Sequence, residues 1–117
     1  MQALTAPRLA SSVQVSAFIR LAAAGGDFAA VLRKGDAVSG AILVVGLVRG
    51  EDASLYERLP LPEGGAQWQQ LGSQNPEIEI DITLRWQKQA TRDPDLWVIE
   101  LDAASPERLA ELLVGGA

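Results

Sequence analysis

The sequence predicts one α+β domain, in which an antiparallel meander sheet of about four to five strands carries two main helices and a short C-terminal helix. Three observations support this fold class. The chain has 117 residues, which suits one domain. Residues 41–48 form an almost unbroken apolar run between glycines, which is typical of a strand covered on both faces. Residues 15–24 instead repeat their apolar side chains at the spacing of a helix.

The helix expected at 15–24 follows a segment without a clear pattern. Its apolar positions are Val15, Phe18, Ile19, Ala22 and Ala23. Gly25-Gly26 can adopt the left-handed backbone that ends a helix. Val13 alternates with the first of these positions, so the entry could instead be a strand end. We expect a flexible N-terminal arm over 1–12 and a single domain over 13–117.

The middle of the chain is expected to form the meander. Residues 28–33 are predicted as a strand, and Lys34-Gly35-Asp36 as the turn that follows it. The apolar run 41–48 would be the central strand, and the glycine within it indicates a bulge or a close backbone approach. Residues 54–59 continue the meander, and residues 67–71 can add a short edge strand.

Residues 77–90 support two interpretations. Isoleucines alternate with polar residues at positions 78, 80 and 82, which is a strand pattern. Asn75-Pro76-Glu77 is instead a good helix start, because asparagine caps, proline fits the first turn and acids suit the helix dipole. A helix would also align Ile78, Ile82, Trp86 and Ala90 on one face. We prefer a helix over 76–91, with the strand as the alternative.

The last third of the chain contains a stop signal, a strand and a helix. Pro94 disfavours helical backbone at the residue before it, so the preceding helix must end there. Residues 96–101 then read as a strand that places Trp97, Ile99 and Leu101 on one face. Ser105-Pro106-Glu107 is a capped start for the short final helix.

Five segments of the chain resemble a known family. They are Val15–Arg20, Val31–Asp36, Gly40–Val44, Leu55–Arg58 and Arg92–Glu100, of which the last, with Asp-Pro-Asp-Leu-Trp before a strand, is the most specific. Together they resemble an uncharacterised family of small proteins found mainly in alphaproteobacteria, a domain of unknown function. The resemblance implies a helix carrying arginines before that motif, which favours the helix over 77–90. It brings no known substrate and no catalytic residue.

The residue types that are missing exclude several chemistries. The chain has no cysteine and no histidine, so thiol nucleophiles, thiolate zinc sites and imidazole bases are excluded. Its net charge is 10 − 15 = −5, which disfavours nucleic acid as a partner. No apolar run is long enough to span a membrane. We expect no membrane association and a cytoplasmic location.

Acidic residues suggest one candidate site. Asp93 and Asp95 flank a proline, so their carboxylates could act as an acid–base pair. With Glu100 they could hold Mg²⁺ or Mn²⁺, which is the basis of an enzyme alternative. The simpler interpretation is a turn in which aspartate side chains accept neighbouring backbone N–H groups. We expect no metal and no other cofactor.

Basic residues suggest two further candidates. They are Arg33 and Lys34 beside Asp36 in the expected turn, and Arg85, Lys88 and Arg92 on the expected helix. Either group could bind an anion, and together they support a nucleotide or nucleic-acid alternative. No phosphate-binding glycine fingerprint accompanies them. A solvated turn and a solvated helix face are the simpler interpretations.

The expected function is a non-catalytic binding or adaptor domain, because no catalytic motif is present. Its partner would be a protein or an anionic ligand. Trp68 follows a glycine-rich loop and is the candidate aromatic anchor, whereas Trp97 is expected in the core. The candidate binding residues are Arg33, Lys34, Asp36, Arg92, Asp93, Asp95 and Trp68. A homodimer through sheet extension is expected if residues 41–48 lie at a sheet edge.

Overall fold

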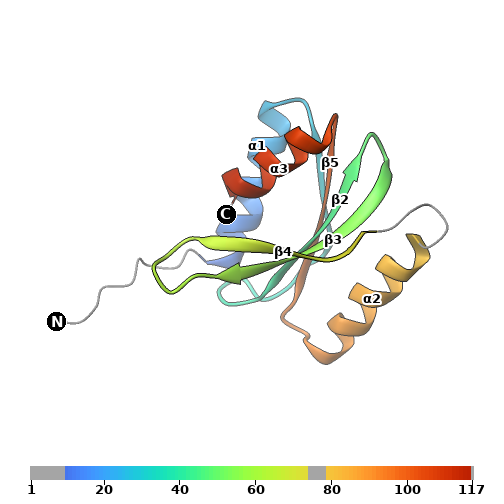
Figure 1. Ribbon diagram of the computed structural model, residues 1–117. Helices are drawn as coiled ribbons and strands as arrows, with labels where there is room; N and C mark the ends of the chain where they lie inside the picture. The colour runs from blue at the N-terminus through green and yellow to red at the C-terminus, as the bar shows by residue number, and fades with distance from the viewer. Residues whose placement is uncertain (1–9, 74–78, 117) are drawn as a thin grey trace.

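The computed structural model describes residues 10–73 and 79–116, which form three helices and five strands (Figure 1). In chain order these are α1 (Ser11–Ala24), β1 (Phe28–Arg33), β2 (Ile42–Val48), β3 (Glu51–Pro60), β4 (Ala66–Ser73), α2 (Glu79–Arg92), β5 (Trp97–Ala103) and α3 (Pro106–Gly116). The α+β class and the elements expected from the sequence are confirmed. Helix α1 starts at Ser11, inside the segment expected to be an arm, and residues 1–9 lie outside the described part.

The strand order is β1-β5-β2-β3-β4, so the sheet is not the purely antiparallel meander that the sequence predicted, although β2, β3 and β4 follow one another antiparallel. Strand β5 lies between β1 and β2, antiparallel to the first and parallel to the second, which makes the sheet mixed. The physical reason is the segment between β1 and β2, which does not form a hairpin. Its carbonyls at Ala37 and Val38 accept N–H groups from the start of α1 at 2.9 and 3.2 Å. The segment therefore anchors a helix and leaves room for β5.

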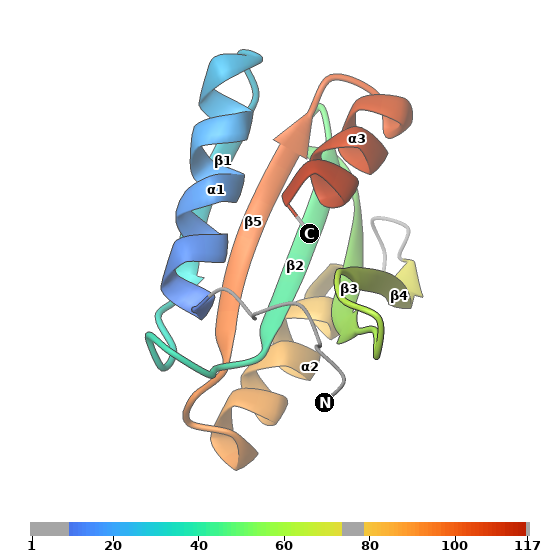
Figure 2. The same cartoon turned by 90° about the vertical axis from the view of Figure 1, so that its left-hand side faces the viewer.

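The sheet separates two hydrophobic clusters. Helices α1 and α3 cover one face, and α2 covers part of the other (Figures 1 and 2). The first cluster contains Val15, Phe18, Ala22, Ile42, Val44, Trp97, Ile99, Leu101, Ala103, Leu109, Leu112 and Leu113. The second contains Leu43, Val45, Leu47, Ala53, Leu55, Ile82, Ala90, Leu96 and Val98. Strands β2 and β5 contribute to both clusters, which confirms the prediction that the apolar run at 41–48 is central.

From Glu79 onward, helix α2 confirms the helix preferred for residues 77–90, and the strand alternative is wrong there. Ile82, Trp86 and Ala90 recur every four residues and face the second cluster. Burial of this stripe outweighs the period-two pattern, because a helix satisfies its own backbone hydrogen bonds. The helix ends at Arg92, just before Pro94, as expected. The expected start at Asn75-Pro76-Glu77 lies outside the described residues.

Two glycines permit the close approach of helices to the sheet and to each other. A Cβ at Gly46 in β2 would lie 2.9 Å from a methyl carbon of Leu109, and the β2–β3 register shifts just after Gly46. The predicted bulge or close approach is thus confirmed. A Cβ at Gly116 would overlap the ring of Phe18, which is completely buried. Both contacts seat α3 tightly against the first cluster.

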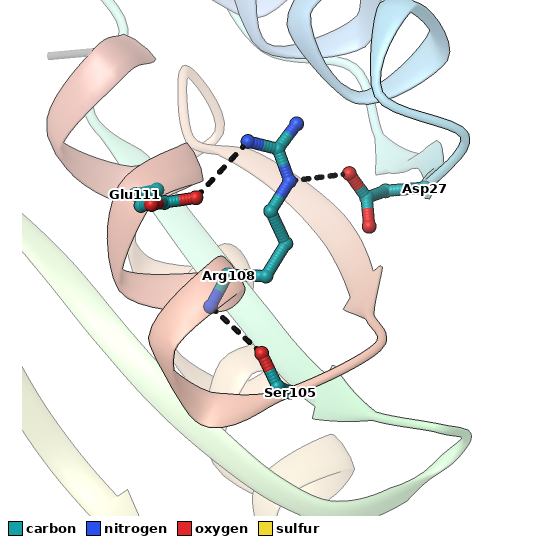
Figure 3. A network of polar contacts seen from close by, with 4 residues as sticks. All are labelled: Asp27, Ser105, Arg108 and Glu111. Carbon is teal, nitrogen blue, oxygen red and sulfur yellow. Dashed lines mark hydrogen bonds and ion pairs between the residues drawn. The ribbon is translucent and has the colours of Figure 1, made fainter.

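An ion pair joins the start of β1 to α3 (Figure 3). Arg108 Nε donates to Asp27 Oδ2 at 2.7 Å, and Arg108 Nη1 donates to Glu111 Oε1 at 3.3 Å. Ser105 Oγ accepts the backbone N–H of Arg108 and so caps α3, as its sequence predicts. The Asp27 carboxylate, followed by that of Glu111, raises the pKa of Arg108. The network fixes α3 to the start of β1, at the edge of the sheet.

In the part of the chain that the structure describes, no helix is long and apolar enough to cross a membrane.

Candidate functional site

Most of the predicted site residues meet where the segment 33–36 touches the segment 93–97, which we call the turn junction. Arg33 ends β1 and reaches across to the second segment. Its Nη1 donates to the carbonyl oxygens of Pro94 at 3.1 Å and Leu96 at 2.6 Å. One guanidinium nitrogen therefore satisfies two backbone acceptors. This cation is used to hold two segments of the chain together.

Backbone contacts fasten the turn junction further. The N–H of Asp36 donates to the carbonyl of Asp95 at 2.9 Å, and Trp97 Nε1 donates to the carbonyl of Asp36 at 2.7 Å. A Cβ at Gly35 or at Gly40 would lie 2.1 Å from the carbonyl oxygen of Asp95. Only glycine fits at either position, because the backbones approach too closely for a side chain.

The side chain of Asp36 stabilises its own loop. Its Oδ2 accepts the backbone N–H of Ser39 at 2.9 Å, the N–H of Val38 at 3.0 Å and the hydroxyl of Ser39 at 3.2 Å. The N–H groups of Ser39 and then Val38 lower the pKa of Asp36, because they stabilise the ionised carboxylate. This carboxylate has a structural role in the loop that carries it.

Asp93 forms the turn that the simpler interpretation predicts. Its Oδ1 accepts the N–H of Asp95 at 3.1 Å, and its carbonyl accepts the N–H of Leu96 at 3.2 Å. Glu100 lies on another part of the sheet, in a cavity beside α2. Within residues 10–73 and 79–116, no group of three or more acidic side chains is arranged to hold a metal ion.

Within the turn junction, the side chains of Lys34 and Asp95 are exposed. The other predicted residues lie outside the junction, and of these Lys88 and Arg92 are exposed on α2. Arg85 Nη1 donates to the carbonyl of Leu71 at 2.6 Å, which ties α2 to β4. Trp68 is half-buried: its Nε1 donates to the carbonyl of Leu113 at 2.9 Å, and its ring meets Phe18 edge to face at 5.7 Å. Trp68 thus extends the first cluster, and Trp97 is in the core as predicted.

The surface is hollowed beside the turn junction. A cavity of about 440 Å³ lies at the N-terminal end of α1, and we call it the α1 pocket. It is lined by Ala10, Ser11, Gln14, Val38, Ser39, Gly40, Ala41, Ile42, Arg58 and Pro60. The residues come from the start of α1, the loop before β2 and the end of β3. The pocket adjoins the turn junction, since Ser39 and Gly40 belong to the loop that Asp36 stabilises.

The described lining of the α1 pocket contains a basic residue and no acidic one. The basic residue is Arg58. The first turn of α1 also contains no acid, so the positive end of the helix dipole faces this region uncompensated by a carboxylate of its own. Ser11 and Gln14 are only 5% and 6% exposed, and Ser11 Oγ donates to the carbonyl of Gly40 at 2.6 Å. The polar wall is therefore built into the fold.

Sequence reasoning missed the α1 pocket, although two signals for it exist. Gln14 occupies the stripe of α1 that otherwise carries Val15, Phe18 and Ala22 into the core. Arg58 follows Ser54 and Tyr56 on the face of β3 that α1 and α3 cover, because alternate residues share a face. A polar residue in an apolar stripe and a cation on an inward face are both departures that can mark a site.

Two further cavities lie elsewhere. One of about 260 Å³ is lined by Leu32, Val45, Leu47, Ala53, Ile82, Thr83, Trp86 and Glu100, between α2 and the sheet. The other, of about 490 Å³, is lined by Tyr56, Ala66, Gln67, Trp68, Gln70, Ala110, Leu113 and Val114, between α3 and β4. Both are mainly apolar, and neither contains a basic side chain among its described lining residues.

Comparison with known proteins identifies relatives that span most of the chain. Residues 9–111 match the family described as a protein of unknown function (DUF1491). The chain is similar to a DUF1491 family protein from Caulobacter crescentus CB15 solved by crystallography, with 37% identity, a TM-score of 0.71, and coverage of 83% of this chain and 88% of that one. It is also similar to protein Atu0922 from A. tumefaciens, with 29% identity, a TM-score of 0.70, and coverage of 88% and 92%. No curated protein matches.

Proposed function

The chain belongs to the DUF1491 family, and from this premise we propose that it is a non-catalytic cytoplasmic binding protein that takes an anionic small molecule in the α1 pocket. The observation that carries the proposal is Arg58, a cation inside a cavity whose described lining has no acidic residue. The ligand would present a carboxylate or a phosphate to the guanidinium group. The absence of cysteine supports the cytoplasmic location.

The electrostatics of the pocket support an anion. The N-terminal end of a helix carries a partial positive charge, and Arg58 lines the same cavity. Arginine is also the side chain best suited to hold a carboxylate or phosphate with two parallel hydrogen bonds.

The first-turn N–H groups of α1 are already occupied, which defines the role of the helix. Ser11 and Ser12 donate to the loop before β2, whereas Val13 and Gln14 donate to the carbonyl of Ala10. The helix would therefore act on a ligand through its dipole, and side chains would make the hydrogen bonds. The volume of about 440 Å³ lies in the range of small-molecule sites.

The enzyme and nucleic-acid alternatives have less support. Asp93 is engaged in its own turn, and Glu100 lies in another cavity. Arg33 and Arg85 each donate to backbone carbonyls, which leaves Lys34, Lys88 and Arg92 as scattered exposed cations. Neither alternative offers a cavity in which several of its residues meet.

Nuclear magnetic resonance titration tests the proposal. The ¹⁵N-labelled full chain is titrated with inorganic phosphate and with succinate, at constant ionic strength set by chloride. We expect saturable shifts at Gln14, Ser39 and Gly40 and at the side chain of Arg58. Arg58→Gln should raise the dissociation constant at least about tenfold.

Arg20→Gln is the matched control, because Arg20 is an exposed arginine on α1, outside the pocket lining, and its replacement changes the net charge equally. It should leave the affinity unchanged. Shifts that grow linearly without saturation, or an equal loss of affinity in both variants, would contradict the anion site.

A further inference from the structure

We propose that the ligand of the α1 pocket is an amphipathic monocarboxylate, a ligand class that rests on the anion-binding function proposed above. Its carboxylate would lie at Arg58 and its aliphatic body along the apolar part of the lining. Five of the ten described lining residues are aliphatic: Ala10, Val38, Ala41, Ile42 and Pro60. A ligand that is polar throughout would leave this half of the wall unmatched.

The hydroxyl groups of the pocket wall already donate within the fold. Ser11 Oγ donates to the carbonyl of Gly40 at 2.6 Å, and Ser39 Oγ donates to Asp36 Oδ2 at 3.2 Å. The backbone N–H groups of Val38 and Ser39 donate to the same oxygen of Asp36 at 3.0 and 2.9 Å. These donors are committed to the protein, so a head group with many oxygens would find few hydrogen bonds in the wall.

The charge of the lining matches one carboxylate. Arg58 carries the single positive charge among the described lining residues, and none of them is acidic. A planar guanidinium group suits the two oxygens of a carboxylate, which accept parallel hydrogen bonds. A phosphate monoester carries about −1.5 to −2 charges at pH 7 and three acceptor oxygens, so it needs more donors than this wall provides.

The apolar part of the pocket is open to solvent. Val38 is 71% exposed, and Ala41 and Pro60 are exposed as well. Val38 and Ala41 lie in the loop before β2, whereas Pro60 ends β3, so two separate elements contribute aliphatic surface. Ile42 is only 3% exposed and continues this surface into the first cluster. An aliphatic body bound here would remove apolar surface from water, which is favourable.

The exposed side chain of Val38 is carried on a fixed backbone. The N–H of Val38 donates to Asp36 Oδ2, and its carbonyl accepts the N–H of Ser11 at 3.2 Å. The carbonyl of Ala41 accepts the N–H of Trp97 at 2.8 Å. The apolar wall is therefore held in place before a ligand binds, and little conformational entropy is lost on binding.

The other two cavities do not combine these features. In its described lining, the cavity between α3 and β4 is mainly apolar and has no basic residue, and the cavity beside α2 contains the acidic Glu100. Among these three cavities, the α1 pocket is the one whose described lining pairs aliphatic surface with a cation. The α1 pocket should therefore select a carboxylate over an uncharged molecule or an amine of the same length.

A series of carboxylates of increasing length tests the ligand class on the ¹⁵N-labelled full chain. Acetate, butanoate and hexanoate are titrated at constant ionic strength, and shifts at Gln14, Ser39 and Gly40 report binding. We expect the affinity to rise by about two- to fourfold for each added methylene. Hexanoate should therefore bind at least about tenfold more tightly than acetate.

Three further probes separate the head group from the aliphatic body. Butanoate should bind more tightly than succinate, which has the same number of carbon atoms, because the second carboxylate of succinate would meet aliphatic lining. Hexan-1-ol and hexylammonium have the same aliphatic body as hexanoate but no anionic head group. Both should bind at least about tenfold more weakly than hexanoate.

Two variants locate the aliphatic body. Val38→Ser should lower the affinity for hexanoate by at least about threefold and leave the affinity for acetate unchanged, because it removes apolar contact beyond the head group. Leu84→Ser is the matched control, because Leu84 is 57% exposed on α2 and lies outside the described lining of the three cavities. It should leave the affinity for hexanoate unchanged.

A failure of the ligand class differs from a failure of the anion site. If acetate binds saturably and depends on Arg58, but hexanoate binds no more tightly, the amphipathic ligand is overturned and the anion site stands. Tighter binding of succinate than of butanoate, or equal hexanoate affinities in Val38→Ser and Leu84→Ser, would overturn the amphipathic ligand in the same way. Hexanoate shifts confined to Gln70 and Ala110, which line the cavity between α3 and β4, would also overturn it. If neither phosphate nor any carboxylate binds saturably, both proposals are overturned.

Discussion

Arg33 and Arg58 are both half-buried arginines in the last part of a strand, but the fold uses them differently. Arg33 donates to two backbone carbonyls across the turn junction. Arg58 instead lines the cavity at the start of α1. The loop between β1 and β2 serves both places, because Asp36 belongs to the first and Ser39 and Gly40 line the second. We infer that the turn junction, through this loop, holds one wall of the α1 pocket in place.

The largest expected loss of stability comes from adding a side chain at Gly35, where the two segments of the turn junction meet. Gly35→Val should reduce the free energy of unfolding by about 3 kcal/mol or more, because the new side chain would meet the backbone of Asp95, which cannot move aside. Urea denaturation followed by tryptophan fluorescence measures the change. Gly26→Ala is the control: its φ of 78° is left-handed but its surroundings are open, so the cost should be about 1 kcal/mol. Equal losses in the two variants would show that crowding at Gly35 is not decisive.

Removing the bridging cation should have the next largest effect. Arg33→Gln is expected to cost about 1–3 kcal/mol, since the carbonyls of Pro94 and Leu96 lose a charged donor. Lys34→Gln, at an exposed neighbouring position, should change the stability by less than about 0.5 kcal/mol. Urea denaturation followed by tryptophan fluorescence measures the free energy of unfolding of both variants. If Arg33→Gln leaves the free energy of unfolding unchanged, the Arg33 side chain does not have the structural role described above.

Arg58 should contrast with Arg33 in its response to a ligand. In the natural chain, saturating phosphate should raise the melting temperature, because a ligand that binds only the folded state stabilises it. Arg58→Gln should lose this response. Thermal unfolding with and without phosphate measures this rise in melting temperature. If Arg58→Gln keeps the rise, Arg58 does not bind the ligand and the contrast with Arg33 is lost.

The smallest expected effect is a pH dependence at Asp36. Its folded-state pKa lies below the ordinary value of 3.8, so its contribution to stability is complete above that value and is lost as the pH falls through the lower, folded-state pKa. The unfolding midpoint of Asp36→Asn should therefore lie below that of the natural chain at pH 6. The gap should narrow as the pH falls below about 3.8. A constant gap between pH 6 and pH 2 would contradict the role of the ionised carboxylate.

Local pattern predicted most elements of the fold. Residues 28–33 form the expected strand, and the apolar run at 41–48 is buried on both faces. The order of the strands could not be predicted in the same way, because it depends on contacts distant in sequence. Strand β5 carries core residues on both faces, such as Val98 and Ile99, and this calls for the interior position between β1 and β2.

The candidate site was predicted only in part. The turn at Asp93 follows from local hydrogen-bonding chemistry, and so does the neighbouring helix stop at Pro94. That Arg33 would reach this turn, 61 residues away in sequence, required the pairing of β1 with β5. The α1 pocket required three separate elements to meet, and no single segment of sequence contains it.

The position of β5 has a consequence for synthesis of the protein. Strands β1 and β2 are made early, yet the strand that lies between them begins only at Trp97. A growing chain on the ribosome therefore holds the apolar strand β2 with one edge open until β5 has emerged. The sheet must close late and through contacts distant in sequence, which predicts slow folding and a nascent chain vulnerable to aggregation.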